Sequence, residues 1–240
     1  MKISVLTMFP EFFGSFLSMP LIKRAREKGK AEIEIIDIKD FSQGSFRHID
    51  DSPFGGGNGM IMRCQPVLDA LESVKTDSSK SILLSPKGSV LSQKKVRELS
   101  KEEHIVLVCG HYEGIDARTE KHIDEQLSIG DYILSGGECA AEVIIDSVVR
   151  LLDGVLREGS ADIETHENGL LEYPQYTRPA DYKGDRVPDV LLSGNDKKIR
   201  EWRLLQSLIL TKKYRPDMFS EYKMSEEEEK IFGEYMKNNE

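Results

Sequence analysis

Short apolar runs alternate with amphipathic segments along the first two-thirds of the chain. The apolar runs are rich in β-branched residues and bounded by polar ones, which predicts buried strands at residues 3–9, 31–38, 81–84 and 104–109. The amphipathic segments predict helices at 19–29, 67–74, around 96–99, in the charged stretch after 115, and at 140–152. Strands that alternate with helices of this length predict an α/β fold with a mostly parallel sheet covered on both faces.

The stretch SIGDYILSGGE, residues 128–138, interrupts this simple pattern. Its apolar centre, Tyr132 to Leu134, predicts a short strand, and glycines lie on both sides of it at Gly130, Gly136 and Gly137. The residues alone leave two interpretations open. The stretch is either a buried strand between two turns or a backbone shaped to hold a ligand.

Three segments share the order of an apolar strand followed by a turn that contains glycine. They are ILLSPKG at 82–88, LVCGHYEG at 107–114 and YILSGGE at 132–138. In open α/β sheets, ligands bind beyond the carboxyl ends of the strands, so three such turns side by side would line one pocket. Any one of them alone is more often an ordinary strand-to-helix turn, because glycine is the usual residue in tight turns.

The last third of the chain has a different character. The polar stretch 159–168 lacks both periodicities and predicts a linker or a lid. Beyond it, Ile199, Trp202, Leu205 and Ile209 share one helical face, and Ser225 followed by Glu228 predicts a capping box for a last helix. We therefore expect a large domain at 1–160, a linker or lid at 161–175 and a small helical domain at 176–240.

Composition narrows the class of protein. Of 240 residues, 39% are hydrophobic and 31% are charged, as in soluble globular proteins, and no apolar run reaches the roughly 18 residues of a membrane span. The N-terminus reads as a strand and not as a signal peptide. Three cysteines without a CxxC pair argue against a disulfide framework or a zinc site, so we expect a reducing cytoplasm.

Net charge bears on nucleic acid as a partner. A charge of −9 argues against coating of nucleic acid through global attraction, but a local basic patch is enough for binding. One candidate patch lies late in the chain, at Lys197, Lys198, Arg200, Arg203, Lys212, Lys213 and Arg215. A basic helix is, however, usually only a solvated face.

Several familiar kinds of site are not supported. FGGGNGM fits neither a Walker loop nor the dinucleotide fingerprint, which argues against a nucleoside triphosphate and against a dehydrogenase, and its plain interpretation is a glycine-rich surface loop. Cys109 and His111 would point differently from a strand end, so a nucleophilic pair is not expected. No spacing of Asp, Glu or His defines a metal site.

Taken in order, longer motifs carry a resemblance. The chain resembles the bacterial tRNA (guanine-N1)-methyltransferases, the TrmD family of the SPOUT superfamily, over nearly its whole length. The motifs that carry it are MFPEFF, DDSPFGGGNGMIM, LSPKG, CGHYEGID, SIGDYILSGGE, IDSVVR, GLLEYPQYTRP, VPDVLLSGN and IREWRLLQSL.

The resemblance implies a deep trefoil knot in the second half of the large domain and S-adenosylmethionine as the methyl donor. In the family, the stretch that matches residues 128–138 passes through the knot and cradles the donor, which favours the second interpretation of that stretch. The residues implied to contact the donor are Ser85, Pro86, Gly110, Ile129, Gly130, Asp131, Tyr132, Ile133, Leu134, Gly136 and Gly137.

The resemblance also implies the reaction, a methyl transfer to N1 of the guanosine just 3′ of the anticodon. Guanine N1 carries a proton at neutral pH, so the reaction needs a base and a group that stabilises charge on O6. Arg150 matches the family position for O6, and Glu113 matches an acid that holds the base or the arginine. The family base is an Asp in the linker. Glu164 stands at the matching position here, and because this linker is one residue shorter than the family pattern, Asp162 is the alternative.

Implied partners are tRNA and a second copy of the chain. The resemblance implies a homodimer with shared active sites, in which one subunit supplies donor pocket and Arg150 and the other supplies linker acid and helical domain. Lys197, Lys198, Arg200 and Arg203 are expected to hold tRNA phosphates, and the family suggests Mg²⁺. The rivals are a protein that binds donor and tRNA with weak or no catalysis, because Glu164 replaces the Asp, and a related methyltransferase acting on another RNA.

Overall fold

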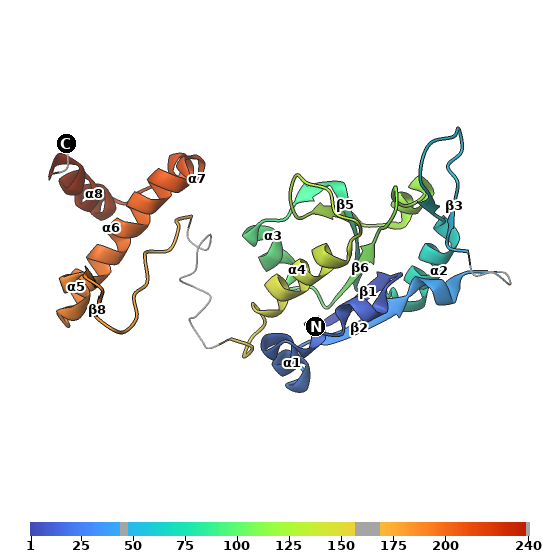
Figure 1. Ribbon diagram of the computed structural model, residues 1–240, viewed down its shortest axis with the longest axis horizontal. Coiled ribbons are helices and arrows are strands. Elements are labelled where there is room, and N and C mark those ends of the chain that lie inside the picture. Colours follow the sequence, from blue (N-terminus) through green and yellow to red (C-terminus); the bar gives the residue numbers. More distant parts are fainter. Residues whose placement is uncertain (44–47, 157–168, 239–240) are drawn as a thin grey trace. The chain divides into compact units, whose positions relative to one another are not determined.

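The computed structural model describes residues 1–43, 48–156 and 169–238 of the chain (Figure 1). The chain forms two compact units, Met1–Arg157 and Glu158–Glu240. The first unit contains the sheet and the second is built mainly of helices. Within the described residues, no helix combines the length and the apolar character that crossing a membrane requires.

A five-stranded sheet forms the centre of the first unit. Its order is β2-β1-β6-β5-β7, and every neighbouring pair is parallel, which confirms the predicted parallel α/β architecture. Every residue of the central strand β6 is buried, because its run HIVLVC offers a side chain to the core on both faces of the sheet. The strand bounds are β1 Lys2–Thr7, β2 Glu32–Asp37, β5 Ser79–Val90, β6 His104–Cys109 and β7 Glu125–Ser128.

Helices cover both faces of this sheet and create two separate cores. Ile105 and Leu107 of β6 point into the core shared with α1, α3 and α4, whereas Val106 and Val108 point into the core shared with α2. This division follows from the two-residue period of a strand. The helix bounds are α1 Pro20–Glu27, α2 Cys64–Val74, α3 Gln93–Leu99 and α4 Glu138–Val149.

Two predicted elements in the second half of this unit are wrong. The strand predicted at Tyr132 to Leu134 is irregular and exposed, and the edge strand is β7, which ends before it. The chain turns at Gly130, whose φ of +150° ends the strand, and the amide of Tyr132 donates back to the Gly130 carbonyl at 3.0 Å. The charged segment before β7, predicted as a helix, forms only the short 3-10 turn η4, Ala117–His122.

Strand β5 contains an interruption that shapes the site. Its pairing with β7 stops after Leu84 and resumes at Ser89, so residues 85–88 loop out of the ladder. Gly88 is required there, because a Cβ on it would stand 2.5 Å from the carbonyl carbon of Gln126 in β7. The remaining small elements of this unit are η1 Pro10–Phe13, η2 Phe16–Ser18, η3 Ile38–Phe41, β3 Asp50–Asp51 and β4 Ile61–Met62.

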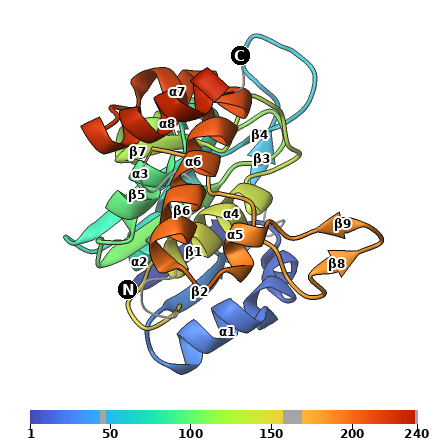
Figure 2. The same ribbon diagram turned by 90° about the vertical axis from the view of Figure 1, so that its left-hand side faces the viewer.

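The second unit packs its helices around a small core of Leu170, Leu208 and Phe232. Its elements are the hairpin β8 Asp181–Tyr182 and β9 Asp185–Arg186, which projects from the unit in Figure 2, and the helices α5 Asp189–Leu192, α6 Asp196–Tyr214, α7 Pro216–Glu221 and α8 Glu226–Asn238. The predicted capping box is confirmed, since the Ser225 amide donates to Glu228 at 2.7 Å and the Glu228 amide donates to Ser225 Oγ at 3.4 Å.

The apolar face predicted for α6 divides into two parts. Leu205 and Ile209 pack against the small core, as a helical stripe normally does. Ile199 and Trp202, one and two turns nearer the start of the helix, instead line a cavity of this unit.

Candidate functional site

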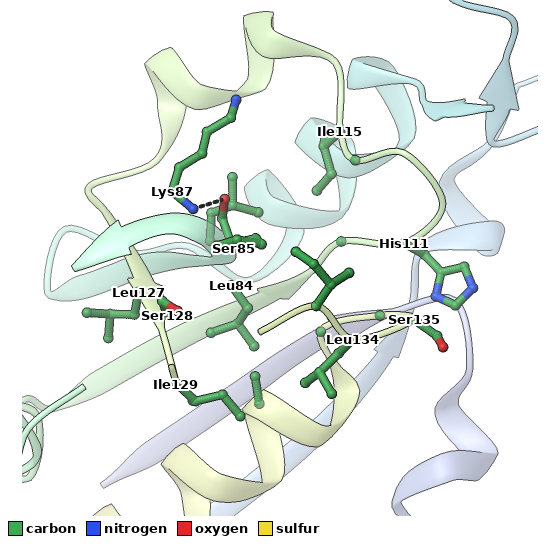
Figure 3. A pocket seen from close by; sticks show the side chains of 18 of the residues that line it. Leu84, Ser85, Lys87, His111, Ile115, Leu127, Ser128, Ile129, Leu134 and Ser135 are labelled. Atoms are coloured by element: carbon green, nitrogen blue, oxygen red, sulfur yellow. Dashed lines mark hydrogen bonds between the residues drawn. The ribbon is translucent and has the colours of Figure 1, made fainter. Parts of the chain in front are cut away.

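A cavity of about 440 Å³ lies at the carboxyl ends of β5, β6 and β7. Residues from all three glycine-containing turns line it, which confirms that the turns meet at one pocket. Figure 3 shows labelled side chains from the three turns around this space, with Leu84 and Ser85 from β5, His111 after β6, and Leu127 and Leu134 on the third segment. The volume lies in the range of small-molecule and cofactor sites.

The inner wall of this cavity is close-packed backbone. The amide of Gly137 donates to the carbonyl of Gly110 at 2.8 Å, and His111 and Gly136 form an isolated bridge. A Cβ on Gly137 would stand 2.8 Å from the Cα of Cys109. The turn that follows β7 can therefore lie against the end of β6 only because it lacks side chains there.

The turn at Gly130 is held by its neighbour Ser128. The Ser128 hydroxyl donates to the Gly130 carbonyl at 2.9 Å, and the Gly130 amide approaches the same hydroxyl oxygen at 3.1 Å. Beyond the turn, Tyr132, Ile133 and Leu134 line the cavity although each is exposed, Ile133 to 80%. Apolar side chains exposed beside a pocket indicate a binding surface.

The loop 85–88 supplies the opposite wall. The Ser85 hydroxyl accepts a hydrogen bond from the Lys87 amide at 3.2 Å, drawn in Figure 3, and the Lys87 ammonium pairs with Glu120 at 3.1 Å. The hydrogen bond from Lys87 is the main reason that the pKa of Glu120 is lowered. Sequence reasoning missed Lys87 and Glu120 as lining residues, because the second lies in a segment predicted as an ordinary helix.

A buried carboxylate lies behind the glycine wall. Glu138 is 5% exposed at the first turn of α4, where the helix dipole favours a negative charge, and the Thr7 hydroxyl donates to it at 2.8 Å. Burial and the nearby Glu138 raise the pKa of the Cys109 thiol well above its usual value. Cys109 is therefore no nucleophile, in agreement with the sequence interpretation.

Glu113 reaches the cavity from the turn after β6 and leans on the glycine-rich loop. Its amide donates to the Met60 carbonyl at 3.1 Å. Gly59 has a φ of +82°, and a Cβ on it would stand 2.5 Å from Glu113 Cγ. The loop that the sequence suggested was plain surface thus supports a residue of the site.

The residues expected to contact the donor gather at this cavity, with one exception. Ser85, Pro86, Gly110, Ile129, Gly130, Tyr132, Ile133, Leu134, Gly136 and Gly137 line it, and Asp131 is not among the lining residues. The further lining residues include Lys87, His111, Ile115, Glu120 and Ser135. Within the described part of the chain, the buried Nδ1 of His111 has no hydrogen-bond partner.

The expected catalytic residues are not all at the cavity. Arg150 caps the far end of α4, and a helix of 12 residues holds its ends about 18 Å apart, so Arg150 does not line the cavity of its own chain. Glu164 and Asp162 lie outside the described residues. The described ranges contain no group of three or more His, Cys, Asp or Glu side chains able to hold a metal ion.

The basic residues expected to hold tRNA lie at the start of α6 in the second unit. Lys197, Lys198, Arg200 and Arg203 are all exposed. Lys197 lies 3.8 Å from Glu201 one turn along the helix, and the Arg203 guanidinium lies over the Tyr173 ring. An exposed pair of this kind is weak and leaves the charge accessible.

Comparison with known proteins extends over the whole chain. The family model described as tRNA (Guanine-1)-methyltransferase TrmD matches residues 1–221. The chain is 53% identical to the tRNA (guanine-N(1)-)-methyltransferase of Ruminiclostridium cellulolyticum, over 92% of this chain and 97% of that protein. It is 48% identical to the proteins of the same name from Clostridium botulinum strain Langeland, over 99% of each chain, and from Geobacillus kaustophilus, over 100% of each. The chain therefore belongs to the TrmD family of tRNA (guanine-N1)-methyltransferases.

Proposed function

We propose that this chain transfers the methyl group of S-adenosylmethionine to N1 of the guanosine just 3′ of the anticodon of tRNA. Membership of the TrmD family supports the reaction. The observation that carries the proposal for this chain is the cavity at the ends of β5, β6 and β7, where glycine backbone replaces side chains. The target nucleoside within the tRNA is part of the proposal.

The cavity fits the donor chemically. S-adenosylmethionine, when bound, supplies an electrophilic methyl group on a sulfonium. Backbone amides and carbonyls near Gly130, Gly136 and Gly137 can hydrogen-bond the edge of an adenine, since no Cβ blocks the approach. The apolar side chains of Ile129 and Leu134 offer contacts to the ring face. Asp131 stays in the proposal as a residue next to this wall.

We further propose that residues 129–137 pass through a trefoil knot. The loop leaves β7 at the sheet edge, passes the neighbouring strand β5 and pairs with the end of β6 through Gly136 and Gly137. A threaded loop needs a return crossing of this kind. Threading would also hold the turn rigid, which keeps the backbone donors and acceptors in place.

The acceptor chemistry is assigned to four residues. Glu164, or Asp162 by a shift in register, takes the N1 proton, and Arg150 stabilises negative charge on O6. Glu113 holds the base or the arginine, and Gly59 positions it. Alignment is the main demand, because a misplacement of about 1 Å can cost ~100-fold in rate.

A homodimer is part of the proposal. Arg150 lies about 18 Å along α4 from the end that lines the cavity, so the site of one chain is incomplete by itself. A second copy would bring the acids, the arginine and the helical unit to one cavity. A mixed dimer of one Gly130→Arg chain and one Arg150→Ala chain reveals which copy supplies Arg150. A site that regains activity needs donor wall and arginine from different chains if neither variant is active alone.

Magnesium and compartment complete the proposal. Mg²⁺ is expected from the family, and since the described residues offer no cluster for it, the ion would arrive with the phosphates of the tRNA. Chelation of Mg²⁺ tests the requirement. The three cysteines are free thiols, which suits the cytoplasm.

The test is methyl transfer from labelled S-adenosylmethionine to a tRNA transcript. We expect transfer by the wild type, a loss of about 100-fold or more in Glu164→Ala, and a small change in Asp162→Ala. The reverse order assigns the base to Asp162. Tight binding of donor and tRNA without transfer would favour the binding protein with weak or no catalysis. Replacement of the target guanosine by adenosine must abolish transfer, or the site of modification is elsewhere.

A further inference from the structure

A second cavity, also of about 440 Å³, lies within the helical unit. The extended segment 173–178 forms one side of it, and α5 with the first half of α6 forms the other. The lining residues are Tyr173, Pro174, Gln175, Tyr176, Thr177, Arg178, Ala180, Val187, Leu191, Leu192, Ile199, Trp202 and Arg203. It shares no residue with the cavity of the first unit.

Aromatic rings and guanidinium groups dominate this cavity. The rings of Tyr176 and Trp202 have centroids 6.3 Å apart and are tilted by 52°, and the Arg203 guanidinium lies 4.8 Å from the centre of the Tyr173 ring. Trp202 and Arg203 are neighbours on one face of α6, where side chains three and four residues beyond Ile199 meet. Among the described residues that line it, two are arginines and none is acidic.

The cavity is not a poorly packed part of the core. The core of this unit is built by Leu170, Leu208 and Phe232 on another side of α6. Around the cavity, Tyr176 is 49% exposed and Leu192 is 57% exposed, and Trp202 is only half-buried. Large rings left partly open to water beside two cations indicate a site for a flat, negatively charged or electron-rich ligand.

We propose that this cavity receives one unstacked nucleobase of the tRNA, with the base against the rings of Trp202 and Tyr176 and its phosphate beside Arg178 or Arg203. The proposal rests on the proposed tRNA substrate. Single-stranded nucleotides bind proteins by stacking on aromatic rings and guanidinium planes, which this cavity supplies together. Lys197, Lys198 and Arg200 begin the same helix and would follow the phosphates on either side.

Trp202 gives the proposal a specific signal, because it is the only tryptophan in the chain. We expect unmodified tRNA, and a short anticodon stem-loop if the base lies there, to quench the fluorescence of Trp202 on binding. Abasic replacement of nucleotides one at a time should remove the quenching at a single position and weaken binding roughly 5- to 100-fold there. Binding that saturates by fluorescence anisotropy of labelled RNA without any quenching overturns the proposal.

Two tyrosines provide a matched pair of variants. Tyr176→Leu removes a ring of the cavity, whereas Tyr182→Leu removes a more exposed ring of the β8–β9 hairpin that does not line it. We expect about tenfold weaker tRNA binding for Tyr176→Leu and no change for Tyr182→Leu. The dependence of affinity on salt concentration should stay the same in both, because neither loses a charge. Equal effects of the two variants would contradict a stacking site.

The outcomes separate this proposal from the proposed function. Methyl transfer to tRNA with no quenching of Trp202 overturns the nucleobase site alone. Absence of any tRNA binding overturns both. Trp202 fluorescence that changes on dilution of the protein without RNA would show that a second copy of the chain covers the cavity, and would also overturn the nucleobase site.

Discussion

The two cavities have similar volumes and are built in opposite ways. The cavity of the first unit is walled by backbone, and Gly130, Gly136 and Gly137 keep side chains out of it. The cavity of the helical unit is walled by side chains, with Trp202 and Tyr176 as its largest surfaces. The first can read the polar edge of a ligand through fixed amides and carbonyls, and the second can hold only a ring face and a charge.

This difference predicts opposite mutational behaviour. In the first cavity, a substitution adds atoms to space that is already filled, so even one methyl group forces the backbone apart. In the second, a substitution removes a surface, so folding persists while affinity falls in proportion to the ring that is lost. The following variants test the contrast, from the largest expected effect to the smallest.

Gly137→Ala should produce the largest effect. Its Cβ would stand 2.8 Å from the Cα of Cys109, so the turn and the end of β6 must separate. We expect a loss of about 1–3 kcal/mol in the free energy of unfolding and at least 100-fold weaker binding of S-adenosylmethionine by calorimetry. Gly14→Ala is the control, since its Cβ meets only an ordinary contact of 3.5 Å with the Glu11 carbonyl. Equal stability of the two variants would argue against a close-packed glycine wall.

Gly59→Ala should affect turnover more than donor binding. Its Cβ would displace Glu113, whose Cγ lies 2.5 Å from that position. We expect kcat to fall about 10- to 100-fold with the donor affinity unchanged. Gly56→Ala is a matched control, because Gly56 has a similar φ of +80° and nothing within 4 Å of its Cβ position. A similar kcat for the two variants would assign the effect of Gly59→Ala to backbone strain instead of Glu113.

Charge reversal at Lys197 and Lys198 should weaken tRNA binding about tenfold and leave donor binding unchanged. The two side chains are exposed at the start of α6, where phosphate contacts would depend on salt. The slope of log affinity against log salt should decrease by roughly 2 to 4. The same reversal at Lys212 and Lys213, at the other end of α6, is the control. Unchanged tRNA affinity in the first variant would reject the patch.

The smallest effect concerns pH and the last helix. Burial alone would raise the pKa of Glu228, but hydrogen bonds from the Ser225 amide and the Tyr222 hydroxyl lower it. A lowered pKa means stabilisation that is present above the usual pKa of a glutamate and is lost as pH falls through the lowered value. Glu228→Gln should therefore flatten the acid side of the stability curve by less than about 1 kcal/mol, after allowance for solvent screening. An unchanged curve in acid denaturation followed by circular dichroism would contradict this account.

Some of the molecule followed from the sequence because the controlling interactions are local. The run at His104–Cys109 has no polar face, so it could only be a central strand, and Ser225 with Glu228 satisfies the first amides of α8 within four residues. The three turns beyond parallel strands also had to meet at one edge of the sheet. The motif resemblance indicated the family, which the comparisons confirm.

The tertiary structure decided what depends on contacts between distant segments. Tyr132 to Leu134 has the composition of a strand, but β5 pairs with residues 125–128 instead, and the turn at Gly130 leaves the apolar segment exposed at the cavity. The need for glycine at Gly137 appears only when Cys109, in another strand, lies behind it. Likewise, the stripe on α6 divides between core and cavity because the small core reaches only as far as Leu205 and Ile209. Periodicity fixes which face of a helix is apolar, but only packing decides what covers that face.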